Sequence, residues 1–174
     1  MQNSNIKVRP ELAEDVPAIR RVEEAAFGRT SEADLVDLCR ERGKAVLSLV
    51  AVDAEWIRGH ILFTAVTLDP PHPGWQGLGI GPVAVLPEFQ RTGIGSHLMN
   101  IGLEICRQNG FDFTVLLGDP AYYCRFGFIP GREFGLSSEY GNGNDFQTRE
   151  LNPGVLRGAK AVVKFVPEFK EAGC

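Results

Sequence analysis

The sequence has few of the features that mark a membrane, secreted or nucleic-acid-binding protein. No apolar run approaches the ~20 residues that a membrane-spanning helix needs. The N-terminal stretch is polar and has no signal-peptide core. The net charge is −4 and no long basic stripe is present, so neither nucleic acid nor a membrane is an expected partner. Together these absences predict a cytoplasmic protein.

Cysteine is also scarce, and the cysteines form no Cys-x-x-Cys pair. The four lie far apart in the sequence, at Cys39, Cys106, Cys124 and Cys174. This spacing argues against a zinc site and against a disulfide framework, so we expect single thiols and no bound metal. A covalent intermediate on Cys124 is disfavoured because no base that would activate its thiol is evident.

The length and the apolar pattern predict one α/β domain over residues 1–174. With 174 residues and 44% hydrophobic residues, the chain can bury a core of its own. The periodicity predicts a strand, two helices, a hairpin, a third β-rich segment, a helix, a buried strand, a short helix and a terminal strand. This order is typical of a mixed α/β fold with a strand–helix–strand crossover in its middle.

Two local signals set boundaries in the first half of the chain. Ser31, followed three residues later by Asp34, is similar to a capping box and predicts the start of the second helix. Gly59 and His60 interrupt the apolar pattern of the β-rich run over 57–68, which predicts a break in that strand.

Glycines shape the expectations for the second half of the chain. Three alternating glycines over 77–81 predict a bulge or a close backbone approach in the strand that follows. The segment 130–152 is polar and rich in glycine, and no strand is predicted there. The β-rich run over 161–166 predicts the last strand.

The most informative stretch runs from Val83 to Ser96. A β-branched run stops at Pro87, and Gly93-x-Gly95 then opens a strongly apolar helical pattern. The first amides of a helix have no internal partner and carry about half a positive charge, so a helix N-terminus binds anions. Glycine lets a phosphate approach those amides closely.

Three phosphate-binding loops and a plain packing turn compete for this stretch. A P-loop needs Lys and then Ser or Thr after its second glycine, where this chain has Ser96 and His97. A dinucleotide fingerprint needs a third glycine, where this chain has Leu98. The spacing Gln90-x-x-Gly-x-Gly95 instead resembles the pyrophosphate loop of the GNAT superfamily of acyl-CoA N-acyltransferases. An unrelated nucleotide-binding α/β protein stays open as an alternative.

A second signature strengthens the resemblance. The stretch Tyr122-Tyr123-Cys-Arg-Phe-Gly127-Phe128 is similar to the Tyr-x-x-x-Gly-Phe element that GNAT enzymes carry after a buried strand. Tyr123 is the matching tyrosine, and Tyr122 is expected to belong to the core. The two motifs come in the family's order, joined by a helix and a strand. Weaker matches resemble the YhbS-like branch, at residues 26–28, 59–63, 81–87 and 152–154.

The resemblance implies a fold and a set of ligand-binding residues. It implies a central twisted mixed sheet, flanked by helices, whose strands splay apart at an acyl-CoA site. The strand before the loop would bind pantetheine through the backbone of Val83 and Val85, and Ala84 between them would also belong to the donor site. The loop and the first helical turn would bind the pyrophosphate, at Gln90, Arg91, Thr92, Gly93, Ile94, Gly95 and Ser96.

The resemblance also implies an activity. The donor would be acetyl-CoA, and a primary amine of a small molecule or a peptide would attack its thioester directly in a ternary complex. Loops over 28–31, 70–75 and 134–146 are expected to shape the acceptor pocket. Dimers are common in the family, so a homodimer is a possible assembly. A GNAT-like module that senses or holds acyl-CoA without turnover is the alternative.

Catalytic roles are only partly assigned by the resemblance. Tyr123 would protonate the departing thiolate, since a free tyrosine with a pKa of ~10 is protonated at neutral pH. No general base stands out. The candidates Glu23, Glu24 and Glu32 are expected as helix-surface charges, and His60 as a hydrogen-bonded strand residue. Glu88 is expected as a solvated turn residue. A chain of water molecules is the alternative to a single base.

Overall fold

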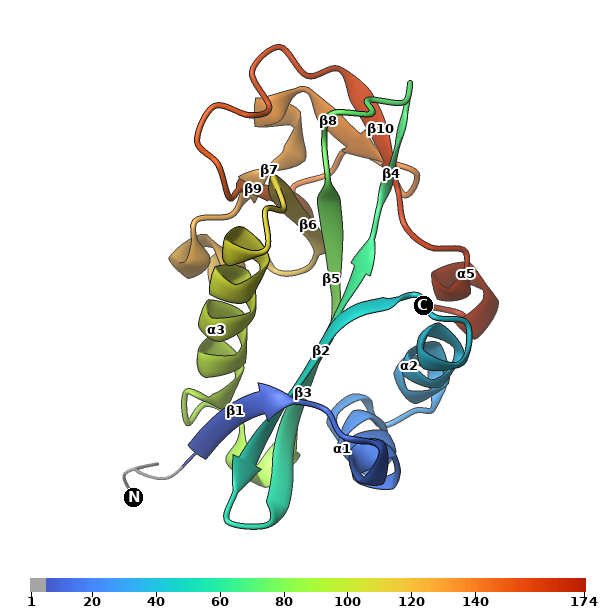
Figure 1. Ribbon diagram of the computed structural model, residues 1–174, viewed down its shortest axis with the longest axis vertical. Helices are drawn as coiled ribbons and strands as arrows, with labels where there is room; N and C mark the ends of the chain where they lie inside the picture. Colours follow the sequence, from blue (N-terminus) through green and yellow to red (C-terminus); the bar gives the residue numbers. More distant parts are fainter. Residues whose placement is uncertain (1–5) are drawn as a thin grey trace. The chain divides into compact units, whose positions relative to one another are not determined.

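The computed structural model of the protein describes residues 6–174, whose contacts gather in two compact units that alternate along the chain (Figure 1). The first unit comprises the chain up to Phe63, Pro82–Gly102 and Pro167–Cys174. The second comprises Thr64–Gly81 and Leu103–Val166. The predicted mixed α/β class is confirmed, because helices alternate with strands that pair both parallel and antiparallel.

The first unit is built on four strands that hydrogen-bond in the order β1-β2-β3-β5. Its elements are β1 (Ile6–Pro10), α1 (Val16–Phe27), α2 (Ser31–Glu41), β2 (Ala45–Asp53), most of β3 (Trp56–Ala65), the end of β5 (Gly77–Val85), the beginning of α3 (Ile94–Gln108) and α5 (Glu168–Ala172). β1 and β2 are antiparallel, with Ile6 opposite Asp53 and Pro10 opposite Leu49. Short 3₁₀ helices cover Ala13–Asp15 and Pro87–Phe89.

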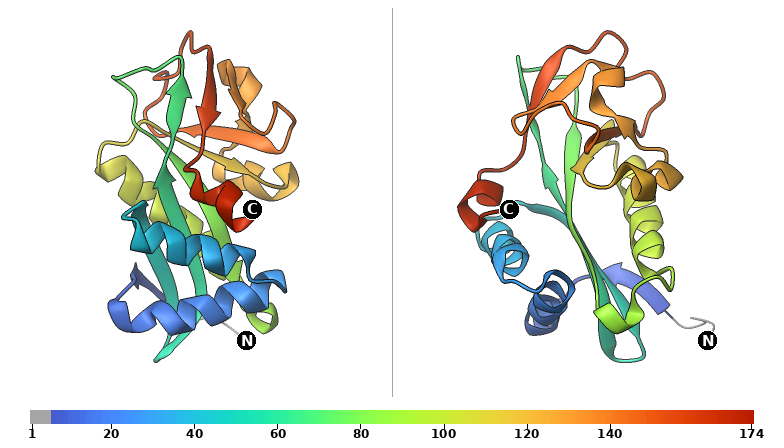
Figure 2. Two further views of the ribbon diagram at one scale, coloured as in Figure 1. Left: turned by 90° about the vertical axis from the view of Figure 1, so that its right-hand side faces the viewer. Right: turned by 180° about the vertical axis from the view of Figure 1, so that it is seen from behind.

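Helices cover both faces of these strands (Figures 1 and 2). Helices α1, α2 and α5 lie on one face, and the beginning of α3 lies on the other. The contact with α3 is close because glycines stand at the interface. A Cβ atom at Gly59 would lie 3.0 Å from side-chain atoms of Ile94 and Leu98, and one at Gly102 would lie 2.5 Å from the Phe63 ring.

Strand β3 passes through Gly59 and His60 without interruption, so the predicted break there is wrong. Both residues are buried. Gly59 is required by the close packing of α3, and the ring nitrogens of His60 both have polar partners. A glycine and a histidine therefore interrupt the apolar pattern without interrupting the strand.

The predicted capping box at Ser31 is also wrong. Helix α2 begins at Ser31, and Thr30 occupies the N-cap position. The Asp34 amide donates to the Thr30 carbonyl at 2.8 Å, while the Asp34 carboxylate accepts from Arg20 of α1 at 2.8 Å. An ion pair between two helices thus uses the carboxylate that the sequence pattern assigned to the cap.

The second unit contains two sets of paired strands, in the orders β5-β6-β9-β7 and β4-β10-β8. β5 pairs parallel with β6, and β6 pairs antiparallel with β9. Its further elements are β4 (Thr67–Asp69), β6 (Phe113–Leu117), α4 (Pro120–Tyr123), 3₁₀ helices over Cys124–Phe126 and Gly131–Phe134, β7 (Ile129–Pro130), β8 (Leu136–Ser138), β9 (Phe146–Glu150) and β10 (Ala161–Lys164).

One expectation for the second half needs correction, and another is confirmed. The segment 130–152 contains strands β8 and β9, which its polar composition concealed. Gln147 and Thr148 of β9 are buried, and Gln147 donates to the Gly118 carbonyl at 3.1 Å. The predicted last strand over 161–166 is confirmed as β10, which pairs with β4 and β8 in a separate small sheet.

Gly102→Ala should destabilise the protein, although alanine is the better helix former. In an exposed helical position the change gains about 1 kcal/mol. Here the added methyl would collide with Phe63, and overpacking of this kind costs about 1–3 kcal/mol. Urea unfolding measures the difference. Asn100→Ala, at an exposed position of the same helix, is the control and should not destabilise. An increase in stability for Gly102→Ala would contradict the close contact.

Candidate active site

The loop singled out in the sequence joins β5 to α3 in the first unit. Two side chains hold its backbone in place. The Gln90 amide donates to the Val85 carbonyl at 3.1 Å, and the Thr92 hydroxyl donates to the Phe89 carbonyl at 2.5 Å. The 3₁₀ helix over Pro87–Phe89 begins with a proline, which fixes the exit from the strand. The loop is therefore braced against the strand that precedes it.

The backbone of the loop aims amide groups outward at the start of α3. The His97 amide donates to the Gly93 carbonyl at 2.9 Å, so Gly93 holds the N-cap position. The amides of Ile94, Gly95 and Ser96 then occupy the first turn, where an α-helix offers them no acceptor. Gly93 has a φ of 94°, and a Cβ atom there would meet nothing within 4 Å. The position of a Cβ atom at Gly93, directly before the helix, is thus open.

Two further features suit this helix start to an anion. Arg91 has a φ of 60°, a left-handed conformation that costs a non-glycine residue roughly 1–2 kcal/mol and that is found at ligand-binding loops. A hollow of about 260 Å³ adjoins the helix start, lined by Ile6, Thr92, Gly93, Ile94 and His97. The strained loop and the open space lie together at the positive end of the α3 dipole.

Strand β5 contains the predicted bulge. The Leu86 amide donates to the Arg58 carbonyl at 2.9 Å, and the Val66 amide donates to the Gly77 carbonyl at 3.1 Å. These bonds enclose residues 58–66 on the β3 side and 77–86 on the β5 side, so the β5 side has one residue more. Gly81, with a φ of 152°, lies within that stretch. A bulge bends a strand and ends regular pairing locally.

The last part of β5 has backbone groups that face away from β3. Pairing with β6 covers only Gly77–Gly79, whereas β5 continues to Val85. Alternate residues of an antiparallel strand direct their backbone groups to opposite sides. Since Leu86 bonds to β3, Val83 and Val85 direct theirs to the other side. These are two of the three residues that the resemblance assigns to the donor, whereas the third, Ala84, directs its backbone toward β3.

Tyr123 lies in the second unit, at the end of α4. Asp119 starts this helix by accepting from the Ala121 amide at 3.0 Å. The Tyr123 ring makes edge contacts with Tyr122 and Phe128, and a Cβ atom at Gly118 would lie only 2.4 Å from it. Burial, with a smaller effect of Tyr122, raises the pKa of Tyr123 to about 12. The hydroxyl is therefore protonated at neutral pH.

Tyr122 is not the core residue that the sequence predicts. It is half-buried, and the Arg125 guanidinium lies 4.6 Å from the centre of its ring. Arg125 also donates to the Tyr122 carbonyl at 2.8 Å. The neighbouring Phe126 is buried instead, because the chain turns into a 3₁₀ helix at Cys124.

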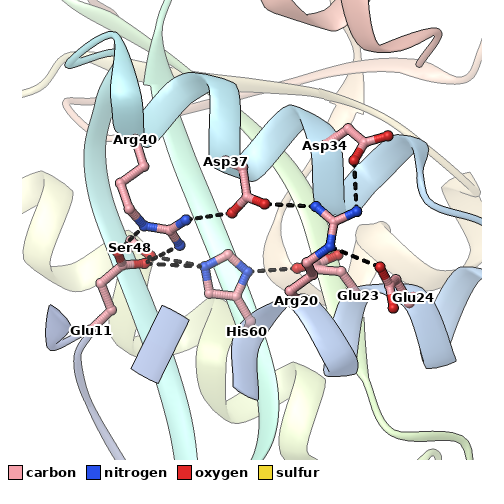
Figure 3. Close-up of polar contacts among 9 residues, drawn as sticks. All are labelled: Glu11, Arg20, Glu23, Glu24, Asp34, Asp37, Arg40, Ser48 and His60. Atoms are coloured by element: carbon pink, nitrogen blue, oxygen red, sulfur yellow. Dashed lines mark hydrogen bonds and ion pairs between the residues drawn. The ribbon is translucent and has the colours of Figure 1, made fainter. Parts of the chain in front are cut away.

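A buried polar cluster in the first unit contains two of the candidate bases (Figure 3). His60 and Glu23 are each 0% exposed, and the His60 Nδ1 lies 2.6 Å from the Glu23 Oε1. The expectation that Glu23 is a helix-surface charge is wrong, because His60 supplies a partner on the face of β3 that α1 covers. The expectation for His60 is confirmed, since its Nε2 lies 2.8 Å from the Ser48 hydroxyl.

The remaining candidates also have partners. Glu24 lies on the surface as expected, 2.9 Å from Arg20. Glu32 is buried, which corrects the expectation, and it pairs with Arg29. Glu88 is exposed in the loop, as expected. Glu23 has its partner on a strand distant in the chain, and Glu32 has its partner in an exposed arginine three residues earlier.

Ion pairs extend this cluster across α1 and α2. Arg40 donates to Glu11 at 2.7 Å and to Asp37 at 2.7 Å, and Asp37 also accepts from Arg20 at 2.7 Å. Burial raises the pKa of the Glu11 carboxyl, but the hydrogen bonds from Arg40 and Ser48 outweigh it and hold that pKa below its usual value. Burial keeps the pKa of Glu23 above its usual value against the opposing bond from His60.

Cysteines and metal ligands contribute no further chemistry to the part of the chain that is described. Burial raises the pKa of Cys39 to about 11 and that of Cys106 to about 12, so both are unreactive thiols. Among residues 6–174, no group of three or more His, Cys, Asp or Glu side chains is placed to hold a metal ion. No helix of the same residues is long and apolar enough to cross a membrane.

Comparison with known proteins identifies the family. A sequence model described as "Acetyltransferase (GNAT) domain" matches residues 7–131. The chain belongs to the GNAT acetyltransferase family. The resemblance read from the two motifs is therefore confirmed, and so is its branch. The uncharacterized N-acetyltransferase YhbS of Escherichia coli K12 is 32% identical over 164 residues, which cover 93% of this chain and 97% of YhbS.

Solved structures of other GNAT proteins share the fold. The crystal structure of Escherichia coli YhbS in complex with CoA matches with a TM-score of 0.91 at 30% identity, covering 95% of this chain and 92% of that one. A GNAT acetyltransferase from Brucella melitensis, in complex with acetyl-CoA, matches with a TM-score of 0.79 at 34% identity, covering 95% and 98%.

The pair His60 and Glu23 should be strongly coupled in stability. His60→Leu leaves a fully buried carboxyl without its partner, which costs about 3–5 kcal/mol. His60→Leu combined with Glu23→Leu replaces both groups by apolar side chains and should recover most of that loss. Chemical unfolding of the two variants measures the coupling. Equal losses of stability in the single and the double variant would show that the contact between His60 and Glu23 does not couple the two residues.

Proposed function

We propose that this GNAT protein transfers the acetyl group of acetyl-CoA to a primary amine by direct attack in a ternary complex. The observation that carries the proposal is the start of α3, where three amides without helical acceptors follow a glycine N-cap and a hollow adjoins them. Those amides, with the helix dipole, suit the pyrophosphate of a CoA donor. The complexes of YhbS with CoA and of the Brucella protein with acetyl-CoA support this choice of donor.

In this proposal the end of β5 binds the rest of the donor. The outward backbone groups of Val83 and Val85 would hydrogen-bond the amides of pantetheine, as an extra strand would. A backbone amide in the same stretch would stabilise the oxyanion that forms when the amine attacks the thioester carbonyl. Ala84 directs its backbone toward β3 and would contribute through packing, because its side chain is buried.

Tyr123 is proposed as the general acid toward the departing sulfur. With a pKa raised to about 12 it stays protonated and can donate a hydrogen bond as negative charge develops. A thiol has a pKa of ~8.5, so tyrosine gives its proton away only if another proton replaces it. The proton lost by the attacking ammonium supplies that replacement, and the thiol leaves neutral.

Deprotonation of the acceptor is assigned to a chain of water molecules. Each of the four side-chain candidates already has a partner: Glu23 with His60, Glu24 with Arg20, and Glu32 with Arg29. None is therefore available as a free base without breaking an ion pair or a buried contact. The acceptor is a small-molecule or peptide amine in this proposal.

Acetyl-CoA and free CoA should raise the melting temperature, whereas ATP and NAD should not. A ligand that binds only the native state adds about 2.7 kcal/mol of stability at a hundred times its dissociation constant. Gly93→Glu should abolish this shift, because its side chain would bring bulk and negative charge in front of the first-turn amides. Thermal unfolding with each ligand measures both effects.

The matched control for Gly93→Glu is Gly110→Glu, just beyond the other end of α3. Both glycines have a positive φ, 94° and 84°, and a Cβ atom at either position would meet nothing within 4 Å, so the backbone strain is alike. Gly110→Glu should keep the full shift. A Gly93→Glu protein that still responds to CoA would place the pyrophosphate elsewhere.

Tyr123→Phe should lower the turnover of acetyl-CoA by about 10²-fold or more, the usual contribution of a general acid, with acetyl-CoA affinity unchanged. Thiol release over a panel of primary amines measures turnover, and isothermal titration measures affinity. Tyr122→Phe, which removes the neighbouring half-buried hydroxyl, is the control and should keep full turnover. Binding without turnover in the unaltered protein would support the sensing module instead of the enzyme.

A further inference from the structure

Four polar side chains of the first unit form a continuous chain of close contacts (Figure 3). The Ser48 hydroxyl contacts the Glu11 Oε2 and lies 2.8 Å from the His60 Nε2. The His60 Nδ1 lies 2.6 Å from the Glu23 Oε1. The order is therefore Glu11, Ser48, His60 and Glu23, with three contacts between them. The last two residues are fully buried, between α1 and β3.

The hydrogen atoms available do not suffice for these contacts. Each contact joins two atoms that carry lone pairs, so each needs one hydrogen between them. The serine hydroxyl supplies one hydrogen and a neutral imidazole supplies one, whereas the two carboxylates supply none. Three contacts therefore require one added proton, whichever tautomer the histidine adopts.

We propose that the chain Glu11–Ser48–His60–Glu23 binds one extra proton on folding and forms a proton-dependent lock between α1 and β3. Without that proton, two lone pairs would face each other in a buried contact. With the proton bound, all three contacts are hydrogen bonds. Loss of the proton leaves an unpaired charge in the interior, which lowers the free energy of unfolding. This inference does not depend on the proposed acetyl transfer.

The surrounding charges place the extra proton at the contact between His60 and Glu23. At the other end, Arg40 of α2 neutralises Glu11, which is partly exposed and stays ionised. Ser48 therefore gives its hydrogen to Glu11 and accepts one from the His60 Nε2. Near Glu23, burial is the main cause that disfavours the negative charge, and the carboxyl of Glu32, itself paired with Arg29, adds to it. The Glu23 Oε2 has no hydrogen-bond partner within residues 6–174, which also favours the protonated pair.

Other titratable groups around this site are already paired or lie outside the chain of contacts. Asp37 of α2 accepts from Arg40 and from Arg20, and Glu24 of α1 pairs with Arg20. The Cys174 thiol responds to the charge of Glu23, but burial is the main cause of its raised pKa of about 11. None of these groups supplies a hydrogen to the three contacts.

The lock should make stability fall as pH rises. In the unfolded chain Glu and His side chains titrate near ~4.3 and ~6.5, so above neutral pH they bind no extra proton. The folded chain still binds one there. A group whose pKa is raised by folding stabilises fully below its unfolded pKa, and that stability is lost as pH rises through the folded value. The loss continues until the folded pair releases its proton.

The test compares the protein with Glu23→Gln in urea unfolding between about pH 7 and pH 9, where an unfolded histidine is neutral. A glutamine amide at this position supplies the third hydrogen itself, so no proton is needed. The unfolding constant of the unaltered protein should rise about tenfold per pH unit relative to Glu23→Gln, equal to about 1.4 kcal/mol. Glu24→Gln, at the half-exposed neighbour on α1, should follow the unaltered protein. Parallel pH dependences for the protein and Glu23→Gln would overturn the proposal.

A second measurement needs no variant and holds even if Glu23→Gln fails to fold. In protein labelled with ¹⁵N histidine, proton spectra at about pH 8, above the usual histidine pKa, should show two exchange-protected protons at the ring of His60. One belongs to Nε2 and the other is shared by Nδ1 and Glu23. His72 and His97 are exposed, so their ring protons exchange with water. A single protected proton at His60 would mean that the extra proton is absent.

Discussion

Strand β5 has to satisfy two neighbours over different parts of its length, and the candidate site depends on this constraint. It pairs with β6 over Gly77–Gly79 only, then contains one extra residue opposite β3 and continues to Val85. The bulge at the glycines releases the strand from regular pairing. The backbone of Val83 and Val85 therefore points away from β3, directly before the loop that starts α3.

The sequence predicts the loop before α3, the bulge in β5 and the family more directly than it predicts the polar contacts of the fold. The turn before α3 and the bulge in β5 could be predicted because glycine has few structural roles in such positions. The spacing of the glycines narrows the possible roles further. Helices with strong apolar periodicity were also predicted, as was the buried strand β6. The family followed from Gln90-x-x-Gly-x-Gly95 and from Tyr123, because both motifs occur in the order that the family shares.

What the sequence did not reveal depends on contacts between distant residues. Glu23 looks like any helical surface charge until His60, on a strand far along the chain, provides its partner. Gln147 looks like a loop residue until the Gly118 carbonyl provides its partner. Asp34 fitted a cap but forms an ion pair with Arg20. In each case a polar side chain was placed by a partner that local patterns cannot indicate.

The proposed donor site consists largely of main-chain groups, which has a consequence for evolution. Amides at the start of α3 and backbone groups at Val83 and Val85 are present whatever side chains surround them, provided that the glycines and the bulge persist. Most residues around such a site can then be substituted without changing the geometry of its backbone groups. The TM-score of 0.91 at only 30% identity to YhbS shows a main-chain fold that is kept while most side chains differ.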